Sequence, residues 1–338
     1  MQSWAVMFWS NNNNPLISQY AADGVSNMTG VTSTRPKIGL ALGAGVARGW
    51  SHIGVIQKLL EEGIEPDVVS GTSVGALVGG CYAAGKLHML EDFARGLTRT
   101  KIFRLLDISW TKSGIISGDK LRELLDDGLG ETRIEHIEKP FICIGTELLT
   151  GHEIWLRKGR LSKAIRASYA LPGVFSPVYF KELWLIDGAV VNPIPVSACR
   201  AMGARMVIAV NLNNDAFGGT VIQAPGLSSM EASMETLNAE QSASKPQKSI
   251  LRQMFGGSND EPGLTTVLMA AFNISQDRLA RSRLAGDPAD ISINPAANGI
   301  GLFDFDRAAD AIAAGRDAAA RIIPDIKQAM ATLEAASH

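Results

Sequence analysis

Short apolar runs recur along the chain, and each predicts a strand buried on both faces of a sheet. Strands of a parallel sheet are apolar along their whole length because helices cover both faces. Three runs have this character, over residues 37–42, 141–145 and 206–212. After the first run, apolar residues at helical spacing predict a helix that Gly63 is placed to end. A strand predicted over residues 66–70 completes a right-handed strand–helix–strand unit.

Weaker patterns predict the remaining elements of a mixed α/β chain. Strands are expected over residues 152–156, 184–188 and 290–293, and helices over residues 76–84, 161–170, 264–284 and 307–335, the last broken at Pro324. Residues 213–263 are rich in Ser, Asn, Gly and Gln with little apolar periodicity, so we expect a flexible insertion or lid there. Residues 1–35 are expected to form a poorly ordered extension. The prediction is one domain over residues 36–336, in which residues 264–336 supply the C-terminal helices and the final strand.

Composition narrows the class of protein. The 338 residues are 46% hydrophobic and 20% charged, which suits one large globular domain, alone or with appendages. The net charge of -2 gives no general attraction to nucleic acid. Three cysteines lie in apolar stretches, so reduced core thiols are expected at Cys81, Cys143 and Cys199. No apolar run reaches about 18 residues and no signal-peptide pattern is visible, which predicts a cytoplasmic protein without a membrane span.

The pentapeptide Gly71-Thr72-Ser73-Val74-Gly75 is the strongest chemical signal in the chain. It follows a predicted strand and precedes a predicted helix. A serine on such a sharp turn is held with its hydroxyl exposed above the sheet, as in a nucleophile elbow. Gly71 and Gly75 leave room for the turn, and the helix N-terminus adds a positive field where negative charge would develop. Ser73 is therefore a candidate nucleophile.

A serine nucleophile needs a proton acceptor, which is usually a histidine. The chain has five histidines, and none is well placed in the sequence to serve Ser73. Asp187 ends an apolar strand and precedes Gly188, where an ionised side chain is costly unless it has a partner or a function. A turn aspartate bonded to its own backbone is the plainer interpretation. Together with the elbow, however, Asp187 is a candidate to accept the proton of Ser73 directly.

A third motif is the glycine-containing loop of residues 43–49, between the first strand and its helix. Its free amides, expected around Gly45, Val46 and Ala47, could bind an oxyanion, and Arg48 would add a fixed charge. Gly43 and Gly49 bound this loop. A dinucleotide-binding loop also follows the first strand, but its second strand ends near an acidic residue. Here that second strand runs into Ser70-Gly71-Thr72-Ser73, which argues against a dinucleotide site.

Together these motifs resemble the patatin-like phospholipase family. The likeness rests on the loop and helix of residues 42–55, the elbow, the segment of residues 167–177 and the Asp-Gly-Ala of residues 187–189. It extends over about residues 37–212 and resumes near residue 264. The chain looks most like the bacterial RssA-like branch, which is related to the esterase domain of neuropathy target esterase.

The resemblance implies a three-layer α/β/α fold with a mostly parallel central sheet. It also implies a Ser73–Asp187 dyad that forms an acyl-enzyme on phospholipids, lysophospholipids or other acyl esters, without a metal or a cofactor. Many family members have three or four consecutive glycines in the oxyanion loop, whereas this chain has Ala44 and Val46 among them. Valine disfavours a positive φ, so the loop departs from the family pattern at Val46.

The sequence leaves other functions open. The fold could serve as a regulatory or adaptor module with weak esterase activity, with residues 213–263 binding a protein partner. The same serine could transfer an acyl group to an alcohol or cleave a thioester. Peripheral contact with the inner face of a membrane is a further option, and its apolar candidates are Trp4, Met7, Phe8, Trp9, Met230, Met234 and Leu237.

Overall fold

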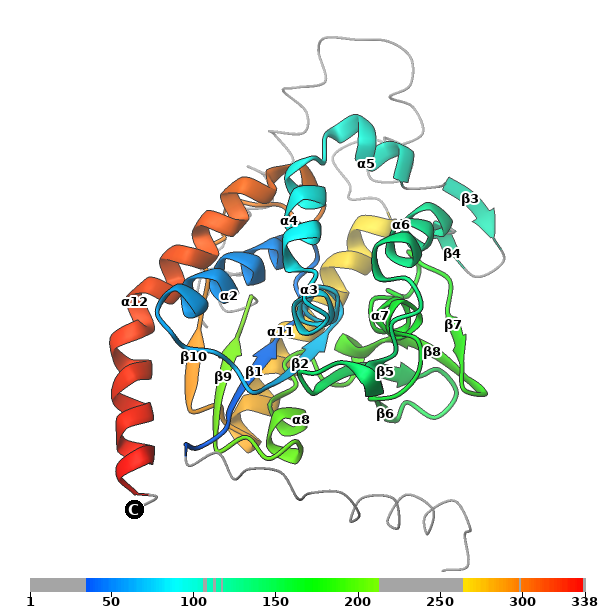
Figure 1. The fold of residues 1–338 in the computed structure, drawn as a ribbon. Helices are drawn as coiled ribbons and strands as arrows, with labels where there is room; N and C mark the ends of the chain where they lie inside the picture. Colours follow the sequence, from blue (N-terminus) through cyan, green and yellow to red (C-terminus); the bar gives the residue numbers. More distant parts are fainter. Residues whose placement is uncertain are drawn as a thin grey trace, which may run out of the picture. The chain divides into compact units, whose positions relative to one another are not determined.

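The computed structural model describes residues 35–105, 108–111, 114–116, 118–212, 264–297 and 299–336 (Figure 1). The expectations for residues 1–34 and 213–263 lie outside these residues. Contacts divide the chain into residues 1–35 and residues 36–338, and every element named below belongs to the second part.

A mixed sheet, eight-stranded in the described residues, forms the centre of the fold. Its strands are β1 (Ile38–Leu42), β2 (Val68–Thr72), β5 (Phe141–Glu147), β6 (Glu153–Leu156), β7 (Val178–Phe180), β8 (Leu183–Asp187), β9 (Met206–Val210) and β10 (Ile291–Ile293). The order is β10-β9-β1-β2-β5-β8-β7, and β6 pairs with β5. Strands from β10 to β5 in this order run parallel, whereas β6, β7 and β8 pair antiparallel. The sheet is therefore mostly parallel, as predicted.

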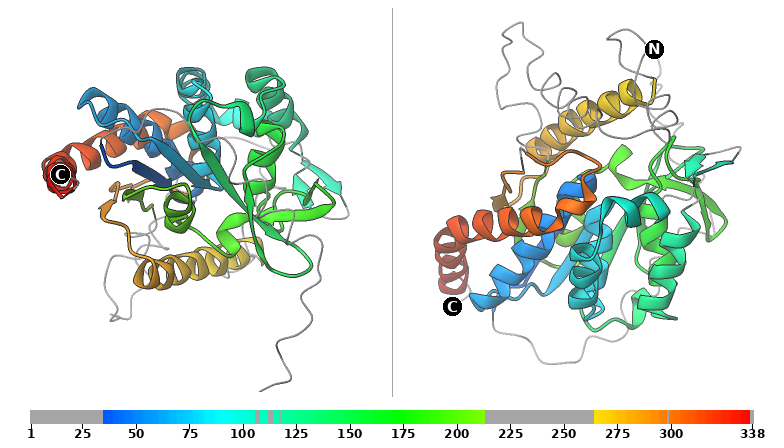
Figure 2. Two further views of the ribbon diagram at one scale, coloured as in Figure 1. Left: turned by 60° about the horizontal axis from the view of Figure 1, so that its bottom comes forward. Right: turned by 90° about the horizontal axis from the view of Figure 1, so that it is seen from above.

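Helices cover both faces of the sheet, which confirms the predicted three-layer fold (Figure 2). One face carries α2 (Ser51–Glu61), α3 (Val74–Ala83), α4 (Leu87–Arg95), α6 (Asp119–Leu129), α7 (Leu161–Ser168) and α12 (Ala308–Ala335). The other face carries α8 (Val196–Ala201) and α11 (Leu264–Gly286). The remaining elements are α5 (Arg99–Leu105), the hairpin of β3 (Ile108–Thr111) and β4 (Gly114–Ile116), and four short 3₁₀ turns in the described residues: η1 (Val46–Trp50), η2 (Ile134–His136), η3 (Gly188–Val190) and η5 (Phe305–Arg307).

Residues of β1 alternate between two cores, which explains why its apolar run is unbroken. Leu40 and Leu42 belong to the large core that includes residues of α2, α3 and α12. Ala41 faces the other way, into a smaller core with Cys199 of α8 and Ala280 of α11. Because all five residues of β1 are buried, the strand is fixed between two helical layers. The loop that follows Leu42 is therefore anchored beside the end of β2.

The expected break at Pro324 is wrong, because α12 runs from Ala308 to Ala335 with Pro324 inside it. Proline removes one helical hydrogen bond and bends the helix, and Figure 1 shows α12 bent rather than ended. Ile323 and Ile326, on either side, are buried in the large core, and this burial offsets the ~3 kcal/mol that an internal proline costs. Neither α12 nor any other helix among the described residues is long and apolar enough to cross a membrane.

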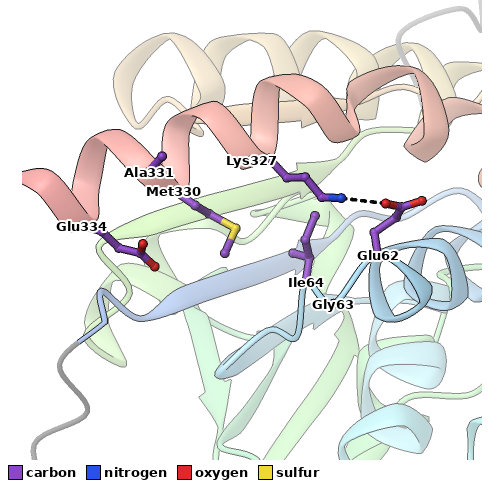
Figure 3. Close-up of a pocket in the computed structure, with 7 residues that line it drawn as sticks. All are labelled: Glu62, Gly63, Ile64, Lys327, Met330, Ala331 and Glu334. Atoms are coloured by element: carbon purple, nitrogen blue, oxygen red, sulfur yellow. Dashed lines mark hydrogen bonds and ion pairs between the residues drawn. The ribbon is translucent and has the colours of Figure 1, made fainter.

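A cavity of about 190 Å³ lies between α12 and the turn after α2 (Figure 3). Its lining residues are Glu62, Gly63, Ile64, Lys327, Met330, Ala331 and Glu334. Lys327 Nζ donates to Glu62 Oε2 across a distance of 2.7 Å, and Figure 3 shows this pair joining α12 to the residue after α2. Ile64 leads into the start of β2, so the cavity lies at the opposite end of that strand from Ser73.

Candidate active site

Ser73 alone joins the end of β2 to the start of α3. Its backbone has φ 57° and ψ -122°, a conformation that is strained for any residue with a Cβ. The turn closes because both flanking residues are glycines. A Cβ at Gly71 would lie 2.3 Å from the Gly75 carbonyl oxygen, and one at Gly75 would lie 2.2 Å from the Leu42 carbonyl oxygen. The pentapeptide therefore folds as a tight strand-to-helix elbow with Ser73 at its apex.

Asp187, at the end of β8, lies directly beside Ser73. The Ser73 hydroxyl donates to Asp187 Oδ2 over 2.7 Å, and the Ala189 amide donates to Asp187 Oδ1 over 2.8 Å. Strand β5 brings the two residues together. Thr72 is paired with Ile144, and Asp187 is paired with Gly145, the next residue of β5. Two segments far apart in sequence thus end at the same place in the sheet.

Asp187 is 1% exposed, and this burial dominates its protonation. Loss of water around the carboxylate raises the pKa of Asp187 from 3.8 to about 7, although hydrogen bonds from the Ala189 amide and the Ser73 hydroxyl act in the opposite direction. A carboxylate with a pKa near 7 can both take up and release a proton at neutral pH. That property suits a general base.

The loop of residues 43–49 touches the elbow, because Leu42 pairs with Gly71 and the loop begins at the next residue. Most of its amides already have partners. The amides of Gly43, Ala44, Ala47 and Arg48 donate to the carbonyls of Val210, Pro193, Leu302 and Gly45 respectively. Within the described part of the chain, the amides of Gly45 and Val46 have no hydrogen-bond partner. These two amides are the loop's donors that remain free for an oxyanion.

Val46 has φ 52°, so the loop does adopt the conformation that valine disfavours. Contacts of the two residues that follow Val46 hold it in place. The Ala47 amide donates to the Leu302 carbonyl over 3.0 Å, and Arg48 Nε donates to the Ile300 carbonyl over 3.1 Å. Arg48 thus ties the loop to residues 300–302, rather than only offering its charge to a ligand. Gly49 packs under Val74, where a Cβ would lie 2.2 Å from the valine methyls.

His52 is hydrogen-bonded to the first residue of the loop, Gly43. It is fully buried at the start of α2, and its Nε2 lies 2.8 Å from the Gly43 carbonyl oxygen, to which the neutral ring donates. Burial lowers the pKa of His52 from 6.5 to about 4, so the ring is neutral at pH 7. Among the described residues, no histidine is hydrogen-bonded to Ser73 or Asp187.

Several buried polar residues around Ser73 and Asp187 were not among the predicted site residues. Ser168 Oγ accepts a hydrogen bond from the Ser73 amide over 3.0 Å. The Thr146 hydroxyl donates to the Asp187 carbonyl, and the Thr72 hydroxyl donates to the Asn192 carbonyl, each over 2.8 Å. Two of them lie in motifs that could have marked them: Thr72 is part of the pentapeptide, and Ser168 is part of the segment of residues 167–177 that carries some of the family resemblance. Within the described residues, no group of three or more His, Cys, Asp or Glu is placed to hold a metal ion.

Comparison with known proteins gives the family. A sequence model of patatin-like phospholipases matches residues 40–200. An NTE family protein of Mycobacterium tuberculosis (strain ATCC 25618 / H37Rv) is 33% identical over 348 aligned residues, covering 89% of this chain and 97% of the relative. Lysophospholipase NTE1 of Saccharomyces cerevisiae is 34% identical over 183 residues, covering 52% of this chain and 11% of that protein. Among solved structures, VipD from Legionella pneumophila matches with a TM-score of 0.43 and 14% identity, covering 86% of this chain and 67% of that one. The chain belongs to the patatin-like phospholipase family and is related to its NTE members.

Proposed function

We propose that the protein is a serine acyl-ester hydrolase that cleaves phospholipids or lysophospholipids with a dyad of Ser73 and Asp187. Membership of the family supports a lipid hydrolase. The observation that carries the finer proposal is the 2.7 Å hydrogen bond from Ser73 Oγ to Asp187 Oδ2 at a strained elbow. The yeast relative is named a lysophospholipase, which supports the substrate class.

The proposed reaction begins when Ser73 Oγ attacks the ester carbonyl carbon and passes its proton to Asp187 Oδ2. The free amides of Gly45 and Val46 stabilise the oxyanion of the tetrahedral intermediate. The intermediate collapses to an acyl-enzyme, and Asp187 returns the proton to the departing alcohol. Asp187 then takes a proton from water, and the hydroxide oxygen attacks the acyl carbon. As the fatty acid leaves, Asp187 returns that proton to Ser73 Oγ. Throughout, the bond from the Ala189 amide to Oδ1 keeps Oδ2 directed at the serine.

Three variants test this proposal on short p-nitrophenyl esters and on lysophospholipids. Ser73→Ala and Asp187→Asn are expected to abolish turnover, whereas Ser162→Ala keeps it. Ser162 is a buried serine whose hydroxyl is bonded to Asp126, so it controls for the loss of a buried hydroxyl. Intact-mass analysis should show an acyl group on the wild type and none on Ser73→Ala. Activity that survives in both dyad variants would overturn the mechanism, and product analysis with an added alcohol separates hydrolysis from acyl transfer.

Peripheral contact with a lipid surface is a second part of the proposal. It is supported by an exposed apolar rim, which we define as Leu148, Leu149, Tyr179 and Trp184. Tyr179 and Trp184 pair across β7 and β8 with ring centroids 5.1 Å apart, and the Leu148 amide donates to the Trp184 carbonyl. Leu148 comes directly after β5, beyond the residues of β5 that pair with Thr72 and Asp187, and its amide is bonded to Trp184. The rim therefore lies at the same end of the sheet as the proposed dyad. Amphipathic aromatic side chains suit an interface between water and lipid.

Sedimentation with phosphatidylcholine vesicles tests the rim. The double variant Tyr179→Ala/Trp184→Ala is expected to lower the bound fraction several-fold. Leu124→Ala, on helix α6 and outside the rim, removes a leucine of 41% exposure and serves as the control that leaves binding unchanged. Equal binding by wild type and the double variant would reject a role for the rim.

A further inference from the structure

The C-terminal end of α7 contacts the backbone of both dyad residues. Ser168, the last residue of the helix, accepts a hydrogen bond from the Ser73 amide over 3.0 Å. Two residues later, the Ala170 carbonyl accepts a hydrogen bond from the Asp187 amide over 2.9 Å. One short segment therefore holds the amide of Ser73, which follows β2, and the amide of Asp187, which ends β8.

The amide of Ser73 depends on this contact because of the elbow. Pairing of β2 with β5 ends at Thr72, and the positive φ of Ser73 then turns the chain out of the strand, so the described part of the sheet supplies no acceptor for the Ser73 amide. Among the described residues, the hydroxyl of Ser168 is the one hydrogen-bond partner of this amide. Ser168 is fully buried, so water does not replace it. A buried amide without a hydrogen-bond partner costs free energy. If Ser168 were lost, the elbow would therefore shift toward any position in which the Ser73 amide reaches another acceptor.

The helix that carries Ser168 is itself firmly packed. Its residues Leu161, Ala164 and Ile165 are fully buried in the large core. Ile165 lies against α3, the helix that starts at the elbow, because a Cβ at Gly80 would lie 2.8 Å from the isoleucine Cδ1. A rigid helix thus fixes the acceptor oxygen relative to the elbow, and the elbow relative to Asp187.

We propose that Ser168 is a positioning residue of the dyad. Its side-chain oxygen accepts a hydrogen bond from the Ser73 amide, and this bond orients Ser73 Oγ toward Asp187 Oδ2. This inference rests on the proposed function of Ser73 as a nucleophile. Ser168 does not touch the reacting atoms, because its oxygen faces the backbone of Ser73 and not its hydroxyl. Its role is to keep the hydroxyl within hydrogen-bonding reach of the base while the acyl group is transferred.

The test measures how fast a fluorophosphonate probe labels Ser73, together with kcat and KM on a p-nitrophenyl ester. Ser168→Ala is expected to lower the labelling rate constant and kcat by about tenfold to a hundredfold, the size expected for a buried amide that loses its partner. KM should change little, because Ser168 does not contact substrate. Ser168→Thr keeps a hydroxyl on the same carbon and should recover part of both rates.

Ser162→Ala is the matched control, since it removes another buried hydroxyl from the same helix. The labelling rate and kcat of Ser162→Ala should equal those of the wild type. Urea unfolding of Ser162→Ala and Ser168→Ala shows whether the two variants lose a similar amount of stability, and the rates should differ between them even if they do. Ser168→Ala labelled at the wild-type rate would overturn the inference. So would equal slowing by Ser162→Ala, or a Ser168→Thr variant no faster than Ser168→Ala. A wild-type protein that the probe does not label would instead overturn the proposed function itself.

Discussion

Asp187→Asn is expected to stabilise the protein, and more strongly as the pH rises. Burial raises the pKa of Asp187 from 3.8 to about 7, so above pH 7 the folded protein holds an ionised carboxylate that water does not solvate. The folded state has the higher pKa, so the destabilisation is absent below pH 3.8, grows with pH and is complete above about pH 7. At about 1.4 kcal/mol per pKa unit, it amounts to about 2 kcal/mol at pH 5 and about 4 kcal/mol at pH 9.

The assay is urea unfolding of wild type and Asp187→Asn at pH 5, 7 and 9, followed by circular dichroism. Asparagine also changes the hydrogen bonds to Ser73 and Ala189, but that contribution does not vary with pH and cancels between conditions. The stability gap between the two proteins should therefore widen by about 2–3 kcal/mol from pH 5 to pH 9. A gap that stays constant over this range would refute the claim that burial raises the pKa of Asp187.

Three further predictions concern rates and the elbow. With Asp187 as base, kcat/KM for a p-nitrophenyl ester should fall about tenfold for each pH unit below about 7, and a profile flat to pH 5 would contradict this. Gly75→Ala places a Cβ 2.2 Å from the Leu42 carbonyl oxygen. It should abolish fluorophosphonate labelling and destabilise the protein by about 3 kcal/mol in urea unfolding, so normal labelling would argue against the tight turn. His52→Leu keeps bulk but removes the donor to the Gly43 carbonyl, and kcat should fall about tenfold with KM unchanged; an unaltered kcat would exclude a role for this bond.

The fold class could be predicted because burial on both faces leaves a direct mark on the sequence. The run at β1 is apolar at every position except Gly39, since Leu40 and Ala41 enter two different cores. Shorter elements carry too few residues to show a period, and β7, with three residues, was not predicted. The break predicted at Pro324 was wrong because contacts outside the local sequence decide whether the helix continues. Local sequence predicts a break, whereas the burial of Ile323 and Ile326 decides that the helix continues.

In the candidate site, too, local sequence patterns predicted some features and contacts between distant segments decided the others. Ser73 and Asp187 could be proposed because each lies in a local pattern, a glycine-flanked elbow and a strand-end Asp-Gly, that has a chemical reason of its own. Their pairing depends on β5, which aligns Thr72 with Ile144 and Asp187 with Gly145, and no local pattern encodes that register. Carbonyls from distant segments also decide which loop amides already have a hydrogen-bond partner. The Ala47 amide, for example, is bonded to the carbonyl of Leu302. Contacts of this kind arise only when segments far apart in sequence pack together.

Burial of Asp187 would also explain how the proposed dyad works without histidine. An exposed aspartate, with a pKa near 3.8, is too weak a base to take a serine proton at neutral pH. Burial brings its pKa to about 7, close to the value of about 6.5 for imidazole. In the proposed dyad the carboxylate would thereby have the basicity that histidine has in a triad, at the expense of folding stability above neutral pH. The stability of Asp187→Asn and the pH dependence of kcat/KM therefore report one property, and both should change around the same pH.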